Sequence, residues 1–221
     1  MTFLNGLKKS DLNIDEHWKI GSTPKTLKEI KKSKFNIVLY ERDTTALTNE
    51  INQLLEEKVH LNLGGEIDAI LDIIRKELSL NKYELIHQDI ENLLLHFSEI
   101  TGAKKFKLLL KTITSNMCLK FHTDINDLRL LCTYSGPGTL WLTNDNINQM
   151  ALKENSRHEY IVLQNNQIKQ AKTGAVVILK GALFPQKNNS AVLHRSPPIE
   201  KQKEKRLLLR IDTNNTLNFE I

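Results

Sequence analysis

The feature that most constrains the fold is a change of sequence pattern near Gly102. Before it, three segments carry apolar residues at spacings of three and four, the period of an amphipathic helix. They begin near Thr48, Ile67 and Tyr83. After Gly102 the apolar segments are short and separated by Gly, Asn, Asp or Pro, which is typical of strands. We expect strands there at 106–112, 117–122, 128–134, 139–142, 160–163, 167–170, 175–179, 191–194, 206–212 and 216–220.

Such a series of short strands predicts an α+β protein. Its core would be an all-β barrel or a double-sheet jelly roll, buttressed by N-terminal helices. A further buried strand is expected at 35–40. Because no flexible linker marks the change of pattern, we expect a single domain over 1–221. Residues 1–102 would form a mainly helical buttress, and 103–221 the β core that carries the candidate site described below.

Composition limits the compartment and the partners. The chain has 221 residues, of which 40% are hydrophobic, and a net charge of +5. Its two cysteines offer no disulfide framework and indicate a reducing compartment. The N-terminus lacks a secretory signal, and no apolar run approaches the ~18 residues that span a bilayer. We therefore expect a cytoplasmic protein with no membrane partner. The lysines look scattered along the sequence, so nucleic acid is not an expected partner either.

The candidate site begins at His122 and Asp124, in an apolar segment that resembles a strand. Residues i and i+2 of a strand point to the same face, so these side chains would lie next to each other. An imidazole and a carboxylate make up two thirds of a two-histidine, one-carboxylate metal site. Arg129 and Asp127 flank this segment, and we expect them to form an ion pair.

His194 is the candidate third ligand, in a segment that ends Leu-His-Arg-Ser-Pro-Pro. The 70-residue gap after Asp124 is compatible with this assignment, because a jelly roll places distant strands next to each other. Two imidazoles and one carboxylate leave open metal positions for a substrate and a gas molecule. The alternative for all three residues is a structural hydrogen bond or turn cap. Cys118 is either a further soft ligand or a small buried residue.

A second candidate element is the strand that begins at Arg206. The planar guanidinium of arginine binds both oxygens of a carboxylate, so it suits an acidic cosubstrate. Arg206 and Arg210 share one strand face, and either could point inward. We favour Arg206 as the anchor, because it lies nearer the expected metal site, and place Arg210 either inside or at the rim.

The sequence FHTD…RLLCTYSGPGTLWL…LKG…HRSPP…RLLLRID resembles a bacterial family described as a domain of unknown function (family 1826), over roughly residues 30–215. The order of these motifs is also similar to that of the 2-oxoglutarate and Fe(II)-dependent dioxygenase superfamily. This similarity implies that the core is a double-stranded β-helix, a jelly-roll or cupin-like barrel. That resemblance implies Fe(II) at His122, Asp124 and His194, and 2-oxoglutarate paired with Arg206. It also implies that Tyr134 or Thr133 contacts the cosubstrate. Many superfamily members carry Arg-x-Ser at the anchor, whereas this chain has Leu208 at the last position.

Three classes of function therefore follow from the sequence. The first is an Fe(II) and 2-oxoglutarate-dependent dioxygenase that hydroxylates or demethylates a small molecule or a protein. The second is a cupin-like metalloprotein that binds Zn(II) or Fe(II) without 2-oxoglutarate. The third is a binding module without catalysis.

Overall fold

The computed structural model describes residues 16–154, 160–185 and 191–213, and shows an α+β fold with two sheets. The larger sheet has seven strands in the order β1-β2-β8-β5-β10-β4-β3, antiparallel except for the pair β1–β2. The smaller sheet has the order β7-β6-β9. The strands are β1 (Trp18–Gly21), β2 (Ile37–Tyr40), β3 (His60–Glu66), β4 (Lys105–Ile113), β5 (Leu128–Ser135), β6 (Leu140–Trp141), β7 (Lys169–Gln170), β8 (Val176–Lys180), β9 (His194–Arg195) and β10 (Arg206–Thr213).

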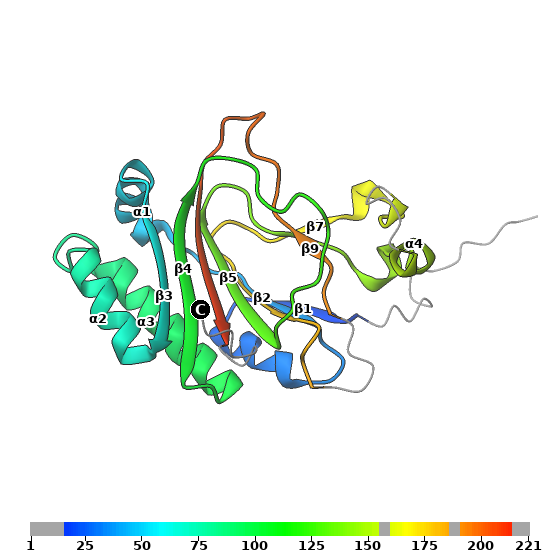
Figure 1. Cartoon of the computed structure of the whole chain (residues 1–221), viewed down its shortest axis with the longest axis horizontal. Helices are drawn as coiled ribbons and strands as arrows, with labels where there is room; N and C mark the ends of the chain where they lie inside the picture. Colours follow the sequence, from blue (N-terminus) through cyan, green and yellow to red (C-terminus); the bar gives the residue numbers. More distant parts are fainter. Residues whose placement is uncertain (1–15, 155–159, 186–190, 214–221) are drawn as a thin grey trace, which may run out of the picture.

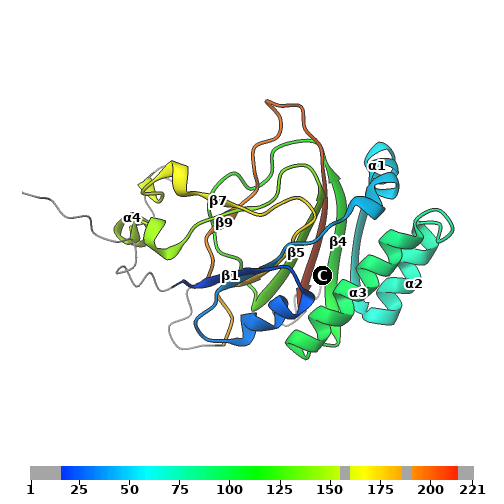
Figure 2. The ribbon, with the colours of Figure 1, turned by 180° about the vertical axis from the view of Figure 1, so that it is seen from behind.

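The three longest α-helices and the smaller sheet lie on opposite sides of the larger sheet (Figures 1 and 2). The helices α1 (Thr48–Glu56), α2 (Ile67–Glu77) and α3 (Glu84–Thr101) lie on one side, and β7 and β9 lie on the other. A short helix, α4 (Gln149–Lys153), lies toward the end of the molecule away from the three helices, and a 3-10 helix spans Pro24–Lys31. One apolar core fills the helix side of the sheet, and a second contains residues of both sheets.

Strands β5 and β10 contribute to both cores because their side chains alternate between the two faces. On β5, Leu130, Cys132 and Tyr134 belong to the helix-side core, whereas Leu131 belongs to the second core. On β10, Leu207, Leu209 and Ile211 belong to the helix-side core. Leu208 faces the smaller sheet, and alternation places Arg206 and Arg210 on that same face.

The helices agree with the periodicity of the sequence. In α3 the apolar stripe is buried, and Gly102 caps the helix with a left-handed φ of 70°. Each fully buried leucine, isoleucine or phenylalanine contributes about 1.5–3 kcal/mol relative to exposure, far more than helix propensity does. Packing against the sheet therefore holds α3 in place.

Several predicted strands differ in the structure. Segments 117–122 and 160–163 form only isolated bridges, at His122 and Val162. A positive φ of 24° at Cys118 interrupts the first of them. The segments near 139–142, 167–170 and 191–194 shorten to the two-residue strands β6, β7 and β9. Strand β3 lies directly before the helix that the sequence predicts from Ile67, in a segment where no strand is predicted. The predicted strand 216–220 lies outside the described residues.

The α+β class is confirmed. The division of the domain at residue 102 stays a prediction, although β1, β2 and β3, all N-terminal to it, complete the larger sheet. Among the described residues, no helix combines the length and the apolar character that a membrane span requires.

Candidate metal centre and anion pocket

The backbone brings the two histidines together across 72 residues of sequence. His122 and His194 form an antiparallel bridge in which each backbone N–H donates to the other carbonyl at 3.0 Å. The carbonyl of Asp124 accepts a hydrogen bond from the N–H of Ala182 at 2.8 Å, which fixes the chain two residues after His122. The contact between the two histidines therefore depends on pairing between distant segments, and only the local His-x-Asp spacing was visible in the sequence.

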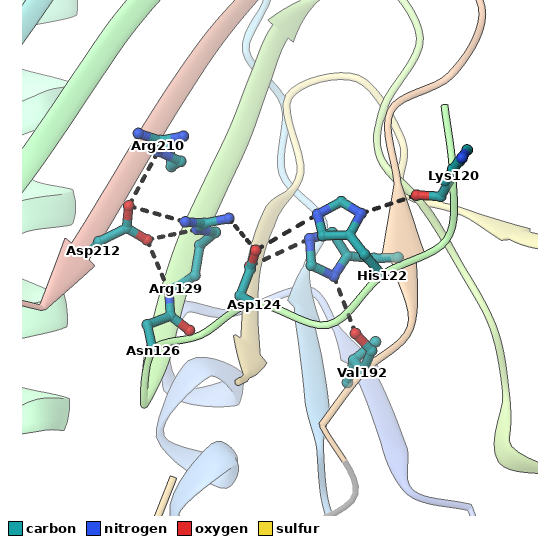
Figure 3. Close-up of polar contacts among 9 residues, drawn as sticks. Lys120, His122, Asp124, Asn126, Arg129, Val192, Arg210 and Asp212 are labelled. Atoms are coloured by element: carbon teal, nitrogen blue, oxygen red, sulfur yellow. Dashed lines mark hydrogen bonds and ion pairs between the residues drawn. The ribbon is translucent and has the colours of Figure 1, made fainter. Parts of the chain in front are cut away.

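The ligand atoms of the three predicted residues converge (Figure 3). The Nε2 atom of His194 lies 3.3 Å from Oδ2 of Asp124, and Nε2 of His122 lies 3.7 Å from Oδ1. One potential ligand atom from each residue lies within 4.8 Å of the other two. The imidazole centroids are 4.7 Å apart, with the rings tilted by 47°. Separations of this size fit three ligands around one small cation.

Hydrogen bonds fix which nitrogen of each histidine faces the centre. The Nδ1 atom of His122 lies 2.9 Å from the carbonyl of Lys120, and that of His194 lies 3.1 Å from the carbonyl of Val192. Because a carbonyl only accepts, Nδ1 must carry the proton in each ring, which leaves the Nε2 lone pair free. Metal-binding histidines are commonly oriented by such a hydrogen bond from the other ring nitrogen.

The two oxygens of the Asp124 carboxylate have different surroundings. Arg129 Nη1 contacts Oδ1 at 2.5 Å, while the buried Oδ2 has no hydrogen-bond partner. The 3.3 Å contact with His194 Nε2 is a hydrogen bond only when that imidazole is protonated, because Nε2 of the neutral tautomer is itself an acceptor. Burial acts to raise the pKa of Asp124, but the neighbouring His194, Arg129 and His122 outweigh it and hold the pKa below its usual range. A cation between the histidines and Oδ2 would satisfy all three atoms.

Arg129 is itself held by a second carboxylate. Its Nε and Nη2 atoms contact the two oxygens of Asp212 at 2.5 and 3.2 Å, and Asn126 donates to Asp212 at 3.1 Å (Figure 3). The sequence predicts Asp127 as the partner of Arg129, and the structure places the carboxylates of Asp124 and Asp212 in contact with it. The sequence contained no signal for Asp212, which lies 83 residues after Arg129.

Arg206 lines the same pocket as His122 and His194. Its side chain is 1% exposed, and its Nη2 donates to Thr133 Oγ1 at 3.1 Å, while its Nε has no hydrogen-bond partner. Burial lowers the pKa of Arg206 to about 10. Within the described part of the chain no carboxylate forms an ion pair with it. A buried guanidinium without a countercharge is costly, so this side of the pocket is suited to an anion.

The structure does not bring Tyr134 to this pocket. Its hydroxyl donates to Asp89 of α3 at 2.6 Å, on the helix side of the sheet, and Arg42 also binds Asp89. The role predicted for Tyr134 is thus corrected by strand alternation, which turns Thr133 toward the pocket and Tyr134 away. Arg210 lies at the pocket rim, with its Nε 3.1 Å from Asp212. Cys118 also lines the pocket but is exposed, contrary to the expected burial, and is not among the converging ligands.

Fold and site together define an α+β protein with a candidate two-histidine, one-carboxylate metal centre. The chain belongs to the family described as "Protein of unknown function (DUF1826)", which matches residues 21–212. Among solved structures, it is similar to a prolyl-4-hydroxylase from Pseudomonas putida, with 10% sequence identity and a TM-score of 0.45. That similarity covers 86% of this chain and 97% of the hydroxylase chain. No curated protein matches the sequence.

Proposed function

We propose that this protein is an Fe(II) and 2-oxoglutarate-dependent dioxygenase that hydroxylates or demethylates its substrate. One observation carries the proposal: a single pocket holds two free Nε2 atoms next to an unsatisfied Asp124 oxygen, and also the buried Arg206. Two imidazoles and one carboxylate with open positions are the ligand set of non-haem Fe(II) oxygenases. The guanidinium is the group best suited to the distal carboxylate of a dicarboxylic cosubstrate.

The strand topology supports a jelly-roll barrel around this pocket. Along the chain, β4, β5, β8 and β10 belong to the larger sheet. The segments that alternate with them, at His122, at β6 and β7, and at β9, belong to the smaller sheet or bridge to it. Such alternation between two facing sheets is the connectivity expected of a double-stranded β-helix. In this arrangement His194 comes from the smaller sheet, His122 bridges to it, and Arg206 comes from the larger one.

Thr133 lies next to the position at which the superfamily anchor carries a serine. Leu208 occupies the position of that serine, and its direct neighbour across the strand pair is Thr133. The Thr133 hydroxyl already accepts a hydrogen bond from Arg206. Thr133 is therefore placed to supply the hydroxyl that β10 lacks. The pocket has a cavity volume of about 70 Å³.

The residues of this chain have separate roles in the proposed reaction. The metal and cosubstrate, when bound, would supply the coupled oxidation by dioxygen of 2-oxoglutarate, to succinate and carbon dioxide, and of a substrate C–H bond, to an alcohol. The histidine Nδ1 hydrogen bonds would keep both Nε2 atoms directed at the metal, and Arg129 would leave one Asp124 oxygen for it. Leu131 and Leu208 also line the pocket and would limit access of water.

The proposal is tested by measuring Fe(II) in protein purified without oxygen and titrating 2-oxoglutarate into it. We expect about one Fe(II) per chain, a visible charge-transfer band on adding 2-oxoglutarate, and succinate release in air. His122→Ala should abolish metal binding and the band. His96→Ala, which changes an exposed histidine of α3, is the matched control and should retain both.

Each other outcome selects a different class of function. If the protein binds metal but 2-oxoglutarate produces neither band nor succinate, it is a cupin-like metalloprotein. If it binds no divalent metal, it is a binding module. Stoichiometric metal in His122→Ala would refute the ligand assignment.

A further inference from the structure

Lysines that look scattered in the sequence gather on one face of the larger sheet. Strands β3 and β4 expose alternate residues on the face opposite the helices. On β4 these include Lys105, Lys107 and Lys111, and on β3 they are His60, Asn62, Gly64 and Glu66. We call this surface the lysine face. The other face of both strands is covered, since Leu61, Phe106, Leu108 and Leu110 belong to the helix-side core.

The register of the sheet joins the lysine face to the metal pocket. Residues directly opposite each other in an antiparallel pair project to the same side. Lys111 is opposite Leu208 and Leu109 is opposite Arg210, and both of these β10 residues line the pocket. Lys107 is opposite Asp212, the residue that holds Arg129. A polypeptide bound across the lysine face would thus reach the pocket by passing from β4 to the neighbouring strand β10, a distance of about 4.8 Å.

The charge on this face is not neutralised within the described residues. None of the three lysines forms an ion pair there, and Lys105 and Lys107 are exposed. Gly64, opposite Lys107, has no side chain, so it leaves this lysine uncovered. Glu66, directly opposite Lys105, is the single acidic side chain among the outward residues of β3. Asp212 is engaged by Arg129 and Arg210. Three lysines next to one such carboxylate leave a net positive charge on the face.

We propose that the lysine face docks an extended acidic polypeptide segment and so presents a residue of that segment to the pocket. This inference rests on the proposed function, because it names a substrate class for the same site. Alternate side chains of an extended peptide are about 7 Å apart, the same repeat that separates Lys105 from Lys107 on their strand. Carboxylates of the segment would pair with these lysines and steer it toward the pocket.

The chemistry of the face favours a polypeptide over a nucleic acid. The face carries no Phe, Tyr or Trp on which bases could stack, since Phe106 points to the helix side. It is also a sheet surface without a projecting helix of the kind that enters a major groove. Cationic side chains spaced along a strand match a partner with strand periodicity instead.

The test is a fluorescence anisotropy titration of the full chain, with Fe(II) under anaerobic conditions, using a fluorescein-labelled decaglutamate peptide. Charge reversal by Lys105→Glu with Lys107→Glu should weaken binding at least about tenfold, as expected when two opposite-charge pairs become like-charge pairs. The control, Lys76→Glu with Lys153→Glu, changes the net charge equally at exposed lysines of α2 and α4 and should change affinity less than about twofold.

The outcomes separate this inference from the proposed function. Loss of peptide binding in the Lys105 and Lys107 variant, with unchanged Fe(II) content and 2-oxoglutarate band, supports docking on the lysine face. Equal weakening in the control, absence of peptide binding in the wild type, or tighter binding of a decathymidylate would overturn it. Peptide binding by a wild-type protein that holds no Fe(II) would refute the dioxygenase and leave the docking face in place.

Discussion

Replacing Arg206 by methionine tests whether the protein retains this guanidinium at a cost in stability. Arg206 is 1% exposed, and burial lowers its pKa from its ordinary value to about 10. That fall of about 2.5 pH units corresponds to about 3 kcal/mol. Because the folded-state pKa lies below the unfolded-state pKa, the cost is fully present below about pH 10 and disappears only as pH rises further.

Methionine removes this cost but also the hydrogen bond to Thr133. A hydrogen bond from a charged donor contributes about 1.5 kcal/mol. We therefore expect metal-free Arg206→Met to be more stable than the wild type by about 1–2 kcal/mol, measured by urea unfolding at pH 7. The matched control is Arg210→Met on the same strand face. Arg210 is partly exposed and pairs with Asp212, so its loss should leave stability unchanged or slightly reduced, by about 0.5 kcal/mol.

The Arg206→Met variant should also lose the stabilisation that 2-oxoglutarate gives to the wild type. With Fe(II) under anaerobic conditions, 2-oxoglutarate at about 100 times its dissociation constant should stabilise the wild type by about 2.7 kcal/mol. It should stabilise Arg206→Met little, because the distal carboxylate has no partner in that variant. A variant destabilised by more than about 1 kcal/mol would refute the cost assigned to the buried charge. Equal stabilisation of both proteins by 2-oxoglutarate would refute the role of Arg206 as an anchor.

Three further predictions concern Arg129, Tyr134 and the buried Lys180. Arg129→Met should destabilise the metal-free protein by about 3 kcal/mol, because it leaves Asp124 and Asp212 without their shared cation. A divalent ion should restore part of that loss in urea unfolding, since it supplies countercharge to Asp124. Tyr134→Phe should cost about 1–2 kcal/mol through the lost bond to Asp89, with unchanged 2-oxoglutarate affinity by titration. Burial lowers the pKa of Lys180 to about 8, below its value in the unfolded chain. The cost of burying the charged amine therefore falls as the pH rises from about 8 to 10, and the stability of the wild type should rise relative to that of Lys180→Met. Urea unfolding of both proteins at both pH values measures this.

Strand alternation explains the correction at Tyr134, and this rule can be applied to the sequence alone. Thr133 and Tyr134 are neighbours on β5, so only one of them could face the pocket. The apolar pattern of β5 did not show which one, since Leu130, Leu131 and Cys132 are all buried. A strand that is buried on both faces has no polar side to mark its orientation. The helix α3 and its Asp89 decide the matter, because they give the Tyr134 hydroxyl a partner on the other face.

The sequence by itself determined the helices α1, α2 and α3, the long strands β4, β5, β8 and β10, and the His-x-Asp pair. These depend on local periodicity and on the chemistry of neighbouring side chains, which are written in short stretches of chain. Only the tertiary structure decided that His194 meets His122, that Asp212 holds Arg129, and that three β4 lysines lie on the pocket side. These contacts join residues dozens of positions apart, and they depend on strand register, which the packing of both faces of the sheet sets together.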